Sequence, residues 1–320
     1  SAWVAVSDIG IAVIGPGAIA DAHLAAFAEI GGTHPVWAVG RDADRTSAFA
    51  HKWGIGRTGI DIADALADSA VGVALICSPN SLHSTQAIQA LEAGKDVILE
   101  IPIALSDADS QHIVDIAESH GRRVFACHTM RSFAGIRHMR DLVASGRESI
   151  TQIVGFFAIP RRNNEGYAGT RTWVDDLLWH HACHLVDATL WVTGNDDITS
   201  PSLLRGTDHP DFGMTMDLTM SFGMGHHSWC IASHSLTYNA SALTWQMRFC
   251  GTQGDYIFDT DTLVGASGQT LVKGASVRDL GFQNAQILEG LRSGASTDFE
   301  ARDVLPAMRA LGLLEKAGLQ

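Results

Sequence analysis

The chain has few cysteines, fewer basic than acidic residues and no long apolar run, and each shortage excludes a class of protein. Five cysteines among 320 residues, an odd number without a C-x-x-C pair, predict free thiols in a reducing cytoplasm and no disulfide framework. Lysine and arginine number 22 against 35 aspartates and glutamates, and the net charge of −13 argues against binding to nucleic acid or to an anionic membrane surface. No apolar run approaches the roughly 20 residues that span a bilayer.

The remaining composition is that of a globular protein. Apolar residues make up 46% of the chain and charged residues 18%, and the length leaves room for two domains. The first ten residues lack a basic segment followed by a long apolar core. We therefore expect a short extension before the first strand and no secretion signal.

Residues 1–127 alternate short, continuous apolar runs with amphipathic segments. Parallel strands buried on both faces and separated by helices have this pattern, so we predict a doubly wound Rossmann sheet, an α/β dinucleotide-binding domain, over residues 1–127. After about residue 150, longer alternating strands are interrupted by one strong helix at 174–191. This predicts a second, α+β domain with an open mixed or antiparallel sheet over residues 128–320.

A glycine-rich turn follows the first apolar run. Gly15-Pro16-Gly17-Ala18-Ile19-Ala20 reads G-x-G-x-x-A, directly after a predicted strand and at the start of a predicted helix. Gly15 permits the tight turn, Gly17 lets the backbone approach a pyrophosphate, and the amides of Ala18 and Ile19 open the helix that faces the phosphates. The alternative is a purely structural turn, but its strand–turn–helix context favours a dinucleotide site.

The second predicted strand ends at Gly40-Arg41. NAD-binding proteins usually carry an acidic residue here, which hydrogen-bonds the ribose and repels a 2′-phosphate. Gly40 has no carboxylate, and the guanidinium of Arg41, with Arg45 one helical turn on, can pair with phosphate. The sequence therefore predicts NADP in preference to NAD. The competing interpretation is a solvated Arg41, partly neutralised by Asp42.

The helix at 174–191 carries three histidines in five residues. His180 and His184 are four apart and point the same way on an α-helix, His181 lies about 100° round, and Asp176 is placed to orient His180. Imidazole is a suitable base for a hydroxyl proton. These histidines are alternatively packed core residues, or a zinc pair beside Cys183. The pattern offers no obvious third ligand, so we expect no metal.

Basic residues gather near this helix on an otherwise acidic chain. Localised positive charge favours a small anionic substrate, here a dicarboxylate. The candidate substrate-binding residues are Arg131, Arg161, Arg162, Asn163, Arg171 and Trp173.

Two further motifs carry a family resemblance. Ser78-Pro79-Asn80-Ser81-Leu82-His83, followed by Ala93-Gly94-Lys95 and Glu100-Ile101-Pro102, resembles the T-P-N-x-x-H turn and the E-K-P strand end of the Gfo/Idh/MocA oxidoreductases. The resemblance implies a Rossmann domain followed by an open-faced substrate domain, whose sheet forms a homodimer or larger homo-oligomer. It also implies cofactor contacts by Ser78, Pro79, Asn80, His83, Glu100, Ile101 and Pro102, with Glu100 placed to touch the nicotinamide ribose.

Within the family the chain is similar to the 4-carboxy-2-hydroxymuconate-6-semialdehyde dehydrogenases of aromatic catabolism, through Glu100-Ile101-Pro102, His128-Thr129-Met130-Arg131 and the histidine helix. This resemblance implies oxidation of a cyclic hemiacetal to 2-pyrone-4,6-dicarboxylate with NADP, and His184 as the base. Two residues depart from the wider family: Ile101 replaces a lysine, and His180 replaces an aspartate. The similar subgroup shares both changes, which indicates a retuned site.

Two alternatives to this activity stay open. The same machinery could act on a sugar or inositol, as in most of the family. The loss of the lysine at Ile101 is the best argument for the other alternative, an NADP-binding regulatory protein that does no chemistry.

Overall fold

The computed structural model describes residues 8–166, 169–226, 229–260, 262–274 and 279–319. The expected N-terminal extension therefore lies mostly outside the described residues. The chain forms two compact units, one of Ser1–Cys127 with Arg278–Asp303 and one of His128–Val277 with Val304–Gln320. The first boundary lies where the change in sequence pattern placed it. The segment Arg278–Asp303, which the pattern assigned to the second domain, instead belongs to the first unit.

The first unit contains a six-stranded sheet of order β3-β2-β1-β4-β5-β6, with every neighbouring pair parallel. The order reverses between β1 and β4, and the crevice for a ligand lies outside the carboxyl ends of the strands at such a reversal. This is the predicted doubly wound Rossmann sheet, which is thereby confirmed. The strands are β1 (Ile9–Ile14), β2 (Thr33–Val39), β3 (Arg57–Gly59), β4 (Val73–Ile76), β5 (Asp96–Leu99) and β6 (Val124–Ala126).

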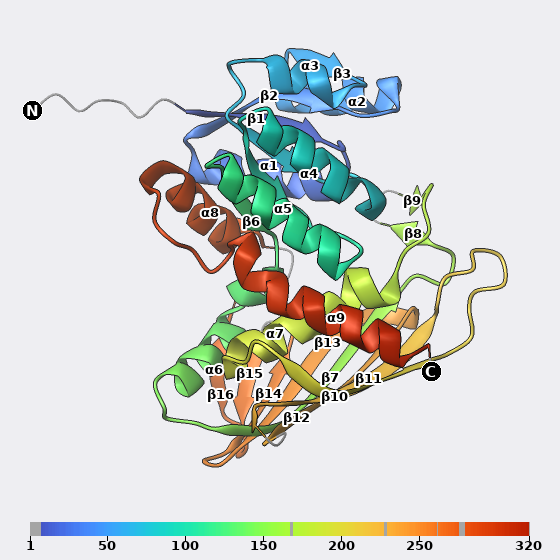
Figure 1. Ribbon diagram of the computed structural model, residues 1–320, viewed down its shortest axis with the longest axis vertical. Coiled ribbons are helices and arrows are strands. Elements are labelled where there is room, and N and C mark those ends of the chain that lie inside the picture. Colours follow the sequence, from blue (N-terminus) through green and yellow to red (C-terminus); the bar gives the residue numbers. More distant parts are fainter. Residues whose placement is uncertain (1–7, 167–168, 227–228, 261, 275–278, 320) are drawn as a thin grey trace, which may run out of the picture. The chain divides into compact units, whose positions relative to one another are not determined.

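Helices pack on this sheet as its continuous apolar strands require. Helices α4 and α5 pack on each other, and α1 packs with α8, which comes from the C-terminal part of the chain (Figure 1). The core between sheet and helices includes Val13, Phe27, Leu75 and Ile287, all nearly inaccessible to solvent. The helices are α1 (Ala18–Ile30), α2 (Ala43–Trp53), α3 (Ile62–Ala67), a 3-10 turn (Asn80–Leu82), α4 (His83–Glu92), α5 (Asp107–Ser119), α8 (Gly281–Ser293) and the 3-10 turn Ala301–Val304.

The second unit is built on a mixed eight-stranded sheet of order β10-β11-β12-β7-β13-β14-β15-β16, as expected for the α+β domain. Only the β12–β7 pair is parallel among the pairs of described strands in this sheet. The strands are β7 (Ile150–Pro160), β10 (Ile198–Arg205), β11 (Asp217–Met224), β12 (Cys230–Thr237), β13 (Asn239–Gly251), β14 (Asp255–Asp259), β15 (Thr262–Gly265) and β16 (Thr270–Lys273). A small separate pair is formed by β8 (Glu165–Gly166) and β9 (Gly169–Thr170).

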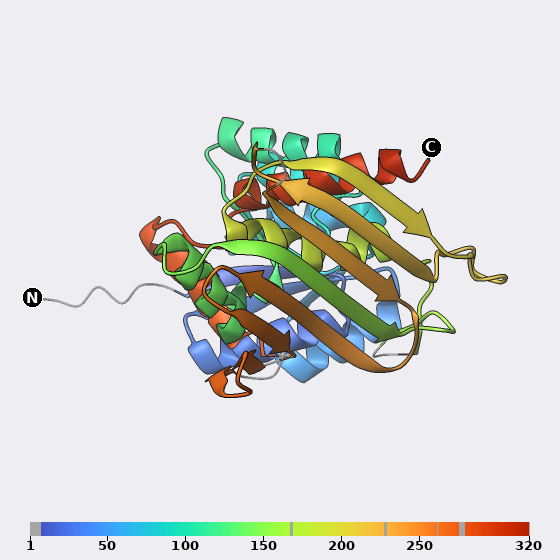
Figure 2. The same ribbon diagram turned by 90° about the horizontal axis from the view of Figure 1, so that it is seen from below.

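The helices of the second unit lie against one face of this sheet, as Figure 2 shows from below. They are α6 (Ala134–Ala144), a π-helix (Leu177–Ala182), α7 (Cys183–Thr193) and α9 (Leu305–Ala317), with the 3-10 turn Thr129–Ser132 before α6. The predicted helix at 174–191 thus begins three residues later and starts with a wide π turn. None of the described helices is both long and apolar enough to cross a bilayer.

Candidate functional site

The glycine-rich turn of the first unit lies at the carboxyl end of β1. Gly15 has a φ of +85°, and a Cβ placed on it would lie 2.6 Å from the amide nitrogen of Ser78. Gly17 caps α1 without any side-chain hydrogen bond, and a Cβ on it would meet nothing within 4 Å. The first amides of α1, beginning with Ala18 and Ile19, are therefore left for a ligand, and this is the arrangement that a pyrophosphate requires.

Gly40 follows β2 and packs tightly against the turn. A Cβ on Gly40 would lie 2.5 Å from Oγ1 of Thr46 and 2.8 Å from Cδ of Pro16, so the close approach of the two segments requires glycine. The carboxylate of Asp42 accepts a hydrogen bond from the amide of Arg45 at 3.0 Å and caps α2. The side chains of Arg41 and Arg45 are both exposed and bring two positive charges to this end of β2.

The segment that follows β4 is hydrogen-bonded to a buried histidine, His83. The two ring nitrogens of His83 lie 2.7 Å from the carbonyl oxygen of Pro102 and 2.8 Å from that of Ser78. Carbonyl oxygens only accept, so both contacts are satisfied together when the ring carries two protons. His83 thus ties the Ser78-Pro79-Asn80 turn to the end of β5. Nδ2 of Asn80, a residue 7% exposed, is buried without a partner among the described residues, which leaves one donor for a ligand.

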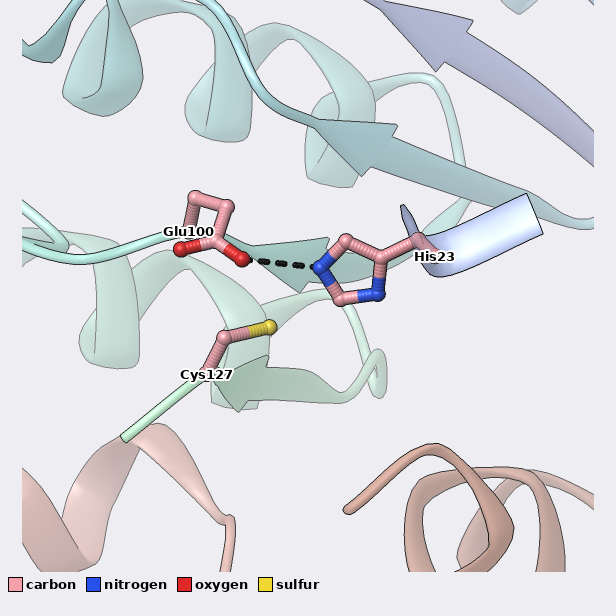
Figure 3. Close-up of side chains that lie close together, drawn as sticks. All are labelled: His23, Glu100 and Cys127. Atoms are coloured by element: carbon pink, nitrogen blue, oxygen red, sulfur yellow. Dashed lines mark hydrogen bonds and ion pairs between the residues drawn. The ribbon is translucent and has the colours of Figure 1, made fainter. Parts of the chain in front are cut away.

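Glu100, at the end of β5, is engaged with the protein itself. Its Oε1 lies 2.8 Å from Nε2 of His23, and its Oε2 accepts from the amide of Ile101 at 3.2 Å. Nδ1 of His23 lies 3.2 Å from Oδ1 of Asn284 on α8. Figure 3 shows the His23 ring facing Glu100, with the thiol of Cys127 beside the pair. Glu100 therefore links helix α1 to the end of β5, and its contact with the nicotinamide ribose stays a prediction.

The thiol in this cluster lies in an environment that disfavours its thiolate form. The Nε2, Oε1 and Sγ atoms of His23, Glu100 and Cys127 lie within 4.8 Å of one another. Burial raises the pKa of the Cys127 thiol, and the neighbouring Glu100 carboxylate raises that pKa further. A metal prefers the thiolate, which this environment disfavours, and His23 and Glu100 already contact each other directly.

In the second unit, a buried carboxylate gathers several of the predicted residues. Oδ1 of Asp175 lies 2.5 Å from Nδ1 of His180, while its Oδ2 accepts from the guanidinium groups of Arg161 and Arg171. The Asp175 side chain is completely buried. The ring of Trp173 lies 6.0 Å from that of His180, and the Arg171 guanidinium lies 4.5 Å from the Trp173 ring. The result is one carboxylate between two arginines and a histidine.

Asp176 does not orient His180, contrary to our expectation. Its carboxylate caps the π-helix by accepting from the amides of Leu178 and Trp179, at 2.9 and 2.8 Å. The prediction assumed α-helical spacing, in which Asp176 lies one turn before His180. Asp175 instead precedes the helix cap, and from there it reaches the imidazole five residues on.

The other two histidines of the helix are more enclosed. Burial lowers the pKa of His181 well below its ordinary value, and the positive charges of His180 and Arg161 lower it further. Nδ1 of His181 lies 2.8 Å from the hydroxyl of Tyr238. Burial also lowers the pKa of His184, with His128 and His180 contributing. The His184 ring packs 4.9 Å from Trp245, and its Nδ1 has no hydrogen-bond partner among the described residues.

Arg131 is buried in a two-pronged ion pair. Its Nε and Nη2 donate to the two oxygens of Asp187 at 2.8 and 2.7 Å, and its guanidinium lies 5.5 Å from the Trp191 ring. Burial raises the pKa of Asp187, but the Arg131 charge more than offsets this and the pKa is lowered overall. Arg131 therefore supports α7 through Asp187, and its contact with a substrate stays a prediction.

The remaining candidates lie outside the Asp175 cluster. Nη2 of Arg162 donates to the carbonyl oxygen of Asn239 at 3.0 Å, and both Arg162 and Asn163 are exposed. Asp175, His180 and His181 also present atoms within 4.8 Å of one another, as a metal site would. The two arginines on Asp175 oppose a bound cation there, and Tyr238 already contacts His181.

Sequence reasoning missed His23, Asn284 and Asp175 as members of these clusters; it noted Asp187 only as the residue one turn after His184, without its partner Arg131. His23 was detectable as a polar residue on the apolar face of α1, three residues after Ala20. Asn284 carried no such signal, because its contact with His23 joins residues 261 positions apart.

Comparison with known proteins places these observations in a family. Residues 9–128 match the model described as the oxidoreductase family, NAD-binding Rossmann fold, and residues 135–275 match that of bacterial oxidoreductases, C-terminal. The chain is 30% identical over 310 residues to 4-carboxy-2-hydroxymuconate-6-semialdehyde dehydrogenase from Sphingobium sp., covering 95% of this chain and 97% of that protein. It is 28% identical to inositol 2-dehydrogenase 3 from Saccharopolyspora erythraea, over 62% of this chain and 57% of that protein.

Solved structures share the fold. Levoglucosan dehydrogenase, in complex with NADH and levoglucosan, superposes with a TM-score of 0.83 at 17% identity, covering 98% of both chains. An oxidoreductase from Agrobacterium radiobacter, in complex with NAD+, L-tartaric acid and magnesium, has a TM-score of 0.84 at 16% identity, covering 98% of this chain and 97% of that one. With both halves matched and a 30% identical relative aligned along nearly its whole length, the chain belongs to the Gfo/Idh/MocA family of oxidoreductases, as its motifs predicted.

Proposed function

We propose that the protein is an NADP-dependent dehydrogenase that oxidises the cyclic hemiacetal of 4-carboxy-2-hydroxymuconate-6-semialdehyde, or a similar carboxylated CH–OH compound, to a lactone such as 2-pyrone-4,6-dicarboxylate. The observation that carries the proposal is the group of two arginines and a histidine on buried Asp175. The similarity to the Sphingobium dehydrogenase over 97% of that protein supports the same substrate.

The cofactor preference rests on the end of β2. Gly40 supplies no carboxylate, and the packing of Pro16 and Thr46 leaves no room for one. The exposed guanidinium of Arg41 is suited to a 2′-phosphate, and Asp42 is occupied as a helix cap. When bound, the nicotinamide supplies the hydride acceptor.

The substrate preference rests on charge. Arg161 and Arg171 bring two guanidinium groups to Asp175 on a chain whose net charge is −13. Guanidinium groups pair well with carboxylates. A carboxylated substrate would therefore be favoured here over an uncharged sugar.

A substrate panel tests this function. Purified protein with NADP+ should form NADPH, followed by its absorbance, from the carboxylated hemiacetal and far more slowly from myo-inositol or glucose. Turnover of inositol or glucose without turnover of the hemiacetal would favour the sugar alternative. No turnover of any CH–OH compound, together with tight NADPH binding, would favour the regulatory alternative that the loss of lysine at Ile101 raises.

We further propose that the protein is cytoplasmic, since all five cysteines are free. We also propose that it is a homodimer or larger homo-oligomer formed through the open face of the eight-stranded sheet. Four large apolar side chains on β7, β12 and β14 are 40–49% exposed: Val154, Phe156, Ile231 and Ile257. Large exposed apolar side chains on one sheet are compatible with an interface between subunits. Light scattering should show a multimer that Phe156→Glu dissociates, while Ile60→Glu, in the other unit, leaves the mass unchanged.

A further inference from the structure

A histidine and two arginines converge on Asp175 in the second unit. This aspartate immediately precedes the helix cap Asp176, and its side chain has no exposed surface. Nδ1 of His180 contacts Oδ1 of Asp175 at 2.5 Å, while Arg161 and Arg171 both donate to Oδ2. Oδ1 thus contacts the imidazole, and Oδ2 contacts the guanidinium groups.

This contact determines where His180 carries its proton. A carboxylate oxygen in an ion pair with arginine only accepts, so Nδ1 of His180 must be the N–H donor. In the neutral ring the proton acceptor is then Nε2. The same logic assigns the imidazole tautomer wherever a carboxylate orients a catalytic histidine.

His180 is also the most accessible of the three histidines on the helix. Its side chain is 16% exposed, whereas residues His181 and His184 are 6% and 8% exposed. Burial lowers the pKa of both His181 and His184, which makes them weak proton acceptors. Nδ1 of His181 additionally contacts the Tyr238 hydroxyl at 2.8 Å.

We infer that Asp175 is a positioning residue that fixes the tautomer and direction of the His180 ring, and that His180, in place of His184, accepts the hydroxyl proton of the substrate. The inference rests on the proposed dehydrogenase function. As the substrate is oxidised, its C–H bond breaks and the electron pair leaves as hydride for the oxidised nicotinamide. The O–H bond of the hydroxyl group on the same carbon also breaks. Its electron pair forms the second C–O bond, and its proton goes to Nε2 of His180.

The two arginines have a distinct part in this arrangement. Their bonds to Oδ2 keep the Asp175 side chain from rotating away from His180, since both oxygens are engaged at once. His184 keeps a role as a hydrogen-bonding group, because its buried Nδ1 has no partner among the described residues.

The first test measures the tautomer directly. Nitrogen-15 NMR of the wild-type protein at neutral pH, with His180 identified by the loss of its signals in His180→Gln, should show Nδ1 protonated and Nε2 unprotonated. Asp175→Asn offers an amide N–H toward the ring and should reverse this pattern. A protonated Nε2 in the neutral wild-type ring, or the same tautomer in both proteins, would overturn the inference. This measurement needs neither substrate nor cofactor, and the wild-type reading stands even if Asp175→Asn does not fold.

The second test separates positioning from folding. Asp175→Asn should lower kcat roughly 10²–10⁴-fold, as expected when a base is held in the wrong tautomer, with little change in the affinity for NADP+. Asp175→Asn combined with His180→Gln should lose little more activity than His180→Gln alone, because the two residues act as a unit. Glu148→Gln is the matched control, since Glu148 is another buried carboxylate of this unit that accepts several hydrogen bonds; its kcat should stay near that of wild type.

The outcomes distinguish this inference from the function on which it rests. If the wild-type protein oxidises the hemiacetal but Asp175→Asn retains its kcat, the function stands and the inference fails. If Asp176→Asn, and not Asp175→Asn, loses kcat, the orienting carboxylate has been misassigned. If no CH–OH compound is oxidised, the proposed function fails, while the tautomer measurement still reports whether Asp175 holds His180.

Discussion

Replacing Arg41 with alanine should remove the preference for NADP. Arg41 is exposed and directly follows Gly40, so its interaction with a 2′-phosphate is partly screened by water. Two unit charges 4 Å apart gain about 1 kcal/mol in water and more where hydrogen bonds form, so the contact should contribute about 1–3 kcal/mol. At about 1.4 kcal/mol per factor of ten, Arg41→Ala should weaken NADP binding about 5- to 150-fold.

The measurement is the Kd of NADP+ and of NAD+ by calorimetry for the wild-type protein, Arg41→Ala and Arg41→Lys. NAD+ lacks the 2′-phosphate, so its Kd should change by less than threefold in Arg41→Ala, while Arg41→Lys should keep part of the preference for NADP+. The loss should shrink at high salt, because exposed charges are screened over about 8–10 Å at physiological ionic strength. An equal loss of affinity for both cofactors would refute the reasoning and show that Arg41 only stacks on the adenine or supports the loop.

Three further perturbations test the fold around the two sites. Gly15→Ala should lower the free energy of unfolding by at least about 2 kcal/mol, because φ is +85° and the new Cβ meets the Ser78 backbone; unchanged denaturant midpoints would contradict this. Arg131→Met should cost about 3–5 kcal/mol, because it leaves the buried Asp187 carboxylate with only His128 as an ion-pair partner among the described residues, and a second substitution, Asp187→Leu, should recover part of the loss. Burial lowers the pKa of His234 to about 3, so below the ordinary pKa the unfolded chain binds a proton that the folded chain does not. His234 should therefore lower the free energy of unfolding by about 1.4 kcal/mol per pH unit as the pH falls from 6.5 towards 3. His234→Leu should reduce the slope of the free energy of unfolding against pH, measured between pH 7 and pH 5.

The Rossmann sheet and its glycine turn were predictable because their causes are local. Continuous apolar strands alternating with helices have one common solution, a parallel sheet covered on both faces. Gly15 stands where the backbone has a positive φ and another strand approaches, which only glycine tolerates without strain. The family motifs at Ser78 and Glu100 follow from the same sheet, since each lies just after a strand.

The contacts that organise the clusters were less accessible, because they depend on tertiary structure. The spacing rule that selected Asp176 holds for an α-helix, but Leu177–Ala182 is a π-helix and the orienting carboxylate lies one residue earlier. Arg131 has the sequence context of a substrate ligand, and only its burial with Asp187 shows that its donors are engaged internally. The role of α8 in the first unit was hidden because a segment from beyond residue 278 returns to a sheet completed before residue 128.

The two departures from the family pattern concern the ionisable groups available for proton transfer. Ile101 is 4% exposed and brings no ionisable group to the end of β5, where Glu100 and His23 contact each other. A dehydrogenase still needs a group that accepts the hydroxyl proton. An aspartate at position 180 would lie beside the carboxylate of Asp175, and like charges at hydrogen-bond distance disfavour the state in which both are ionised. A histidine there donates to Asp175 and leaves its other nitrogen as an acceptor, which is the role that we infer for His180.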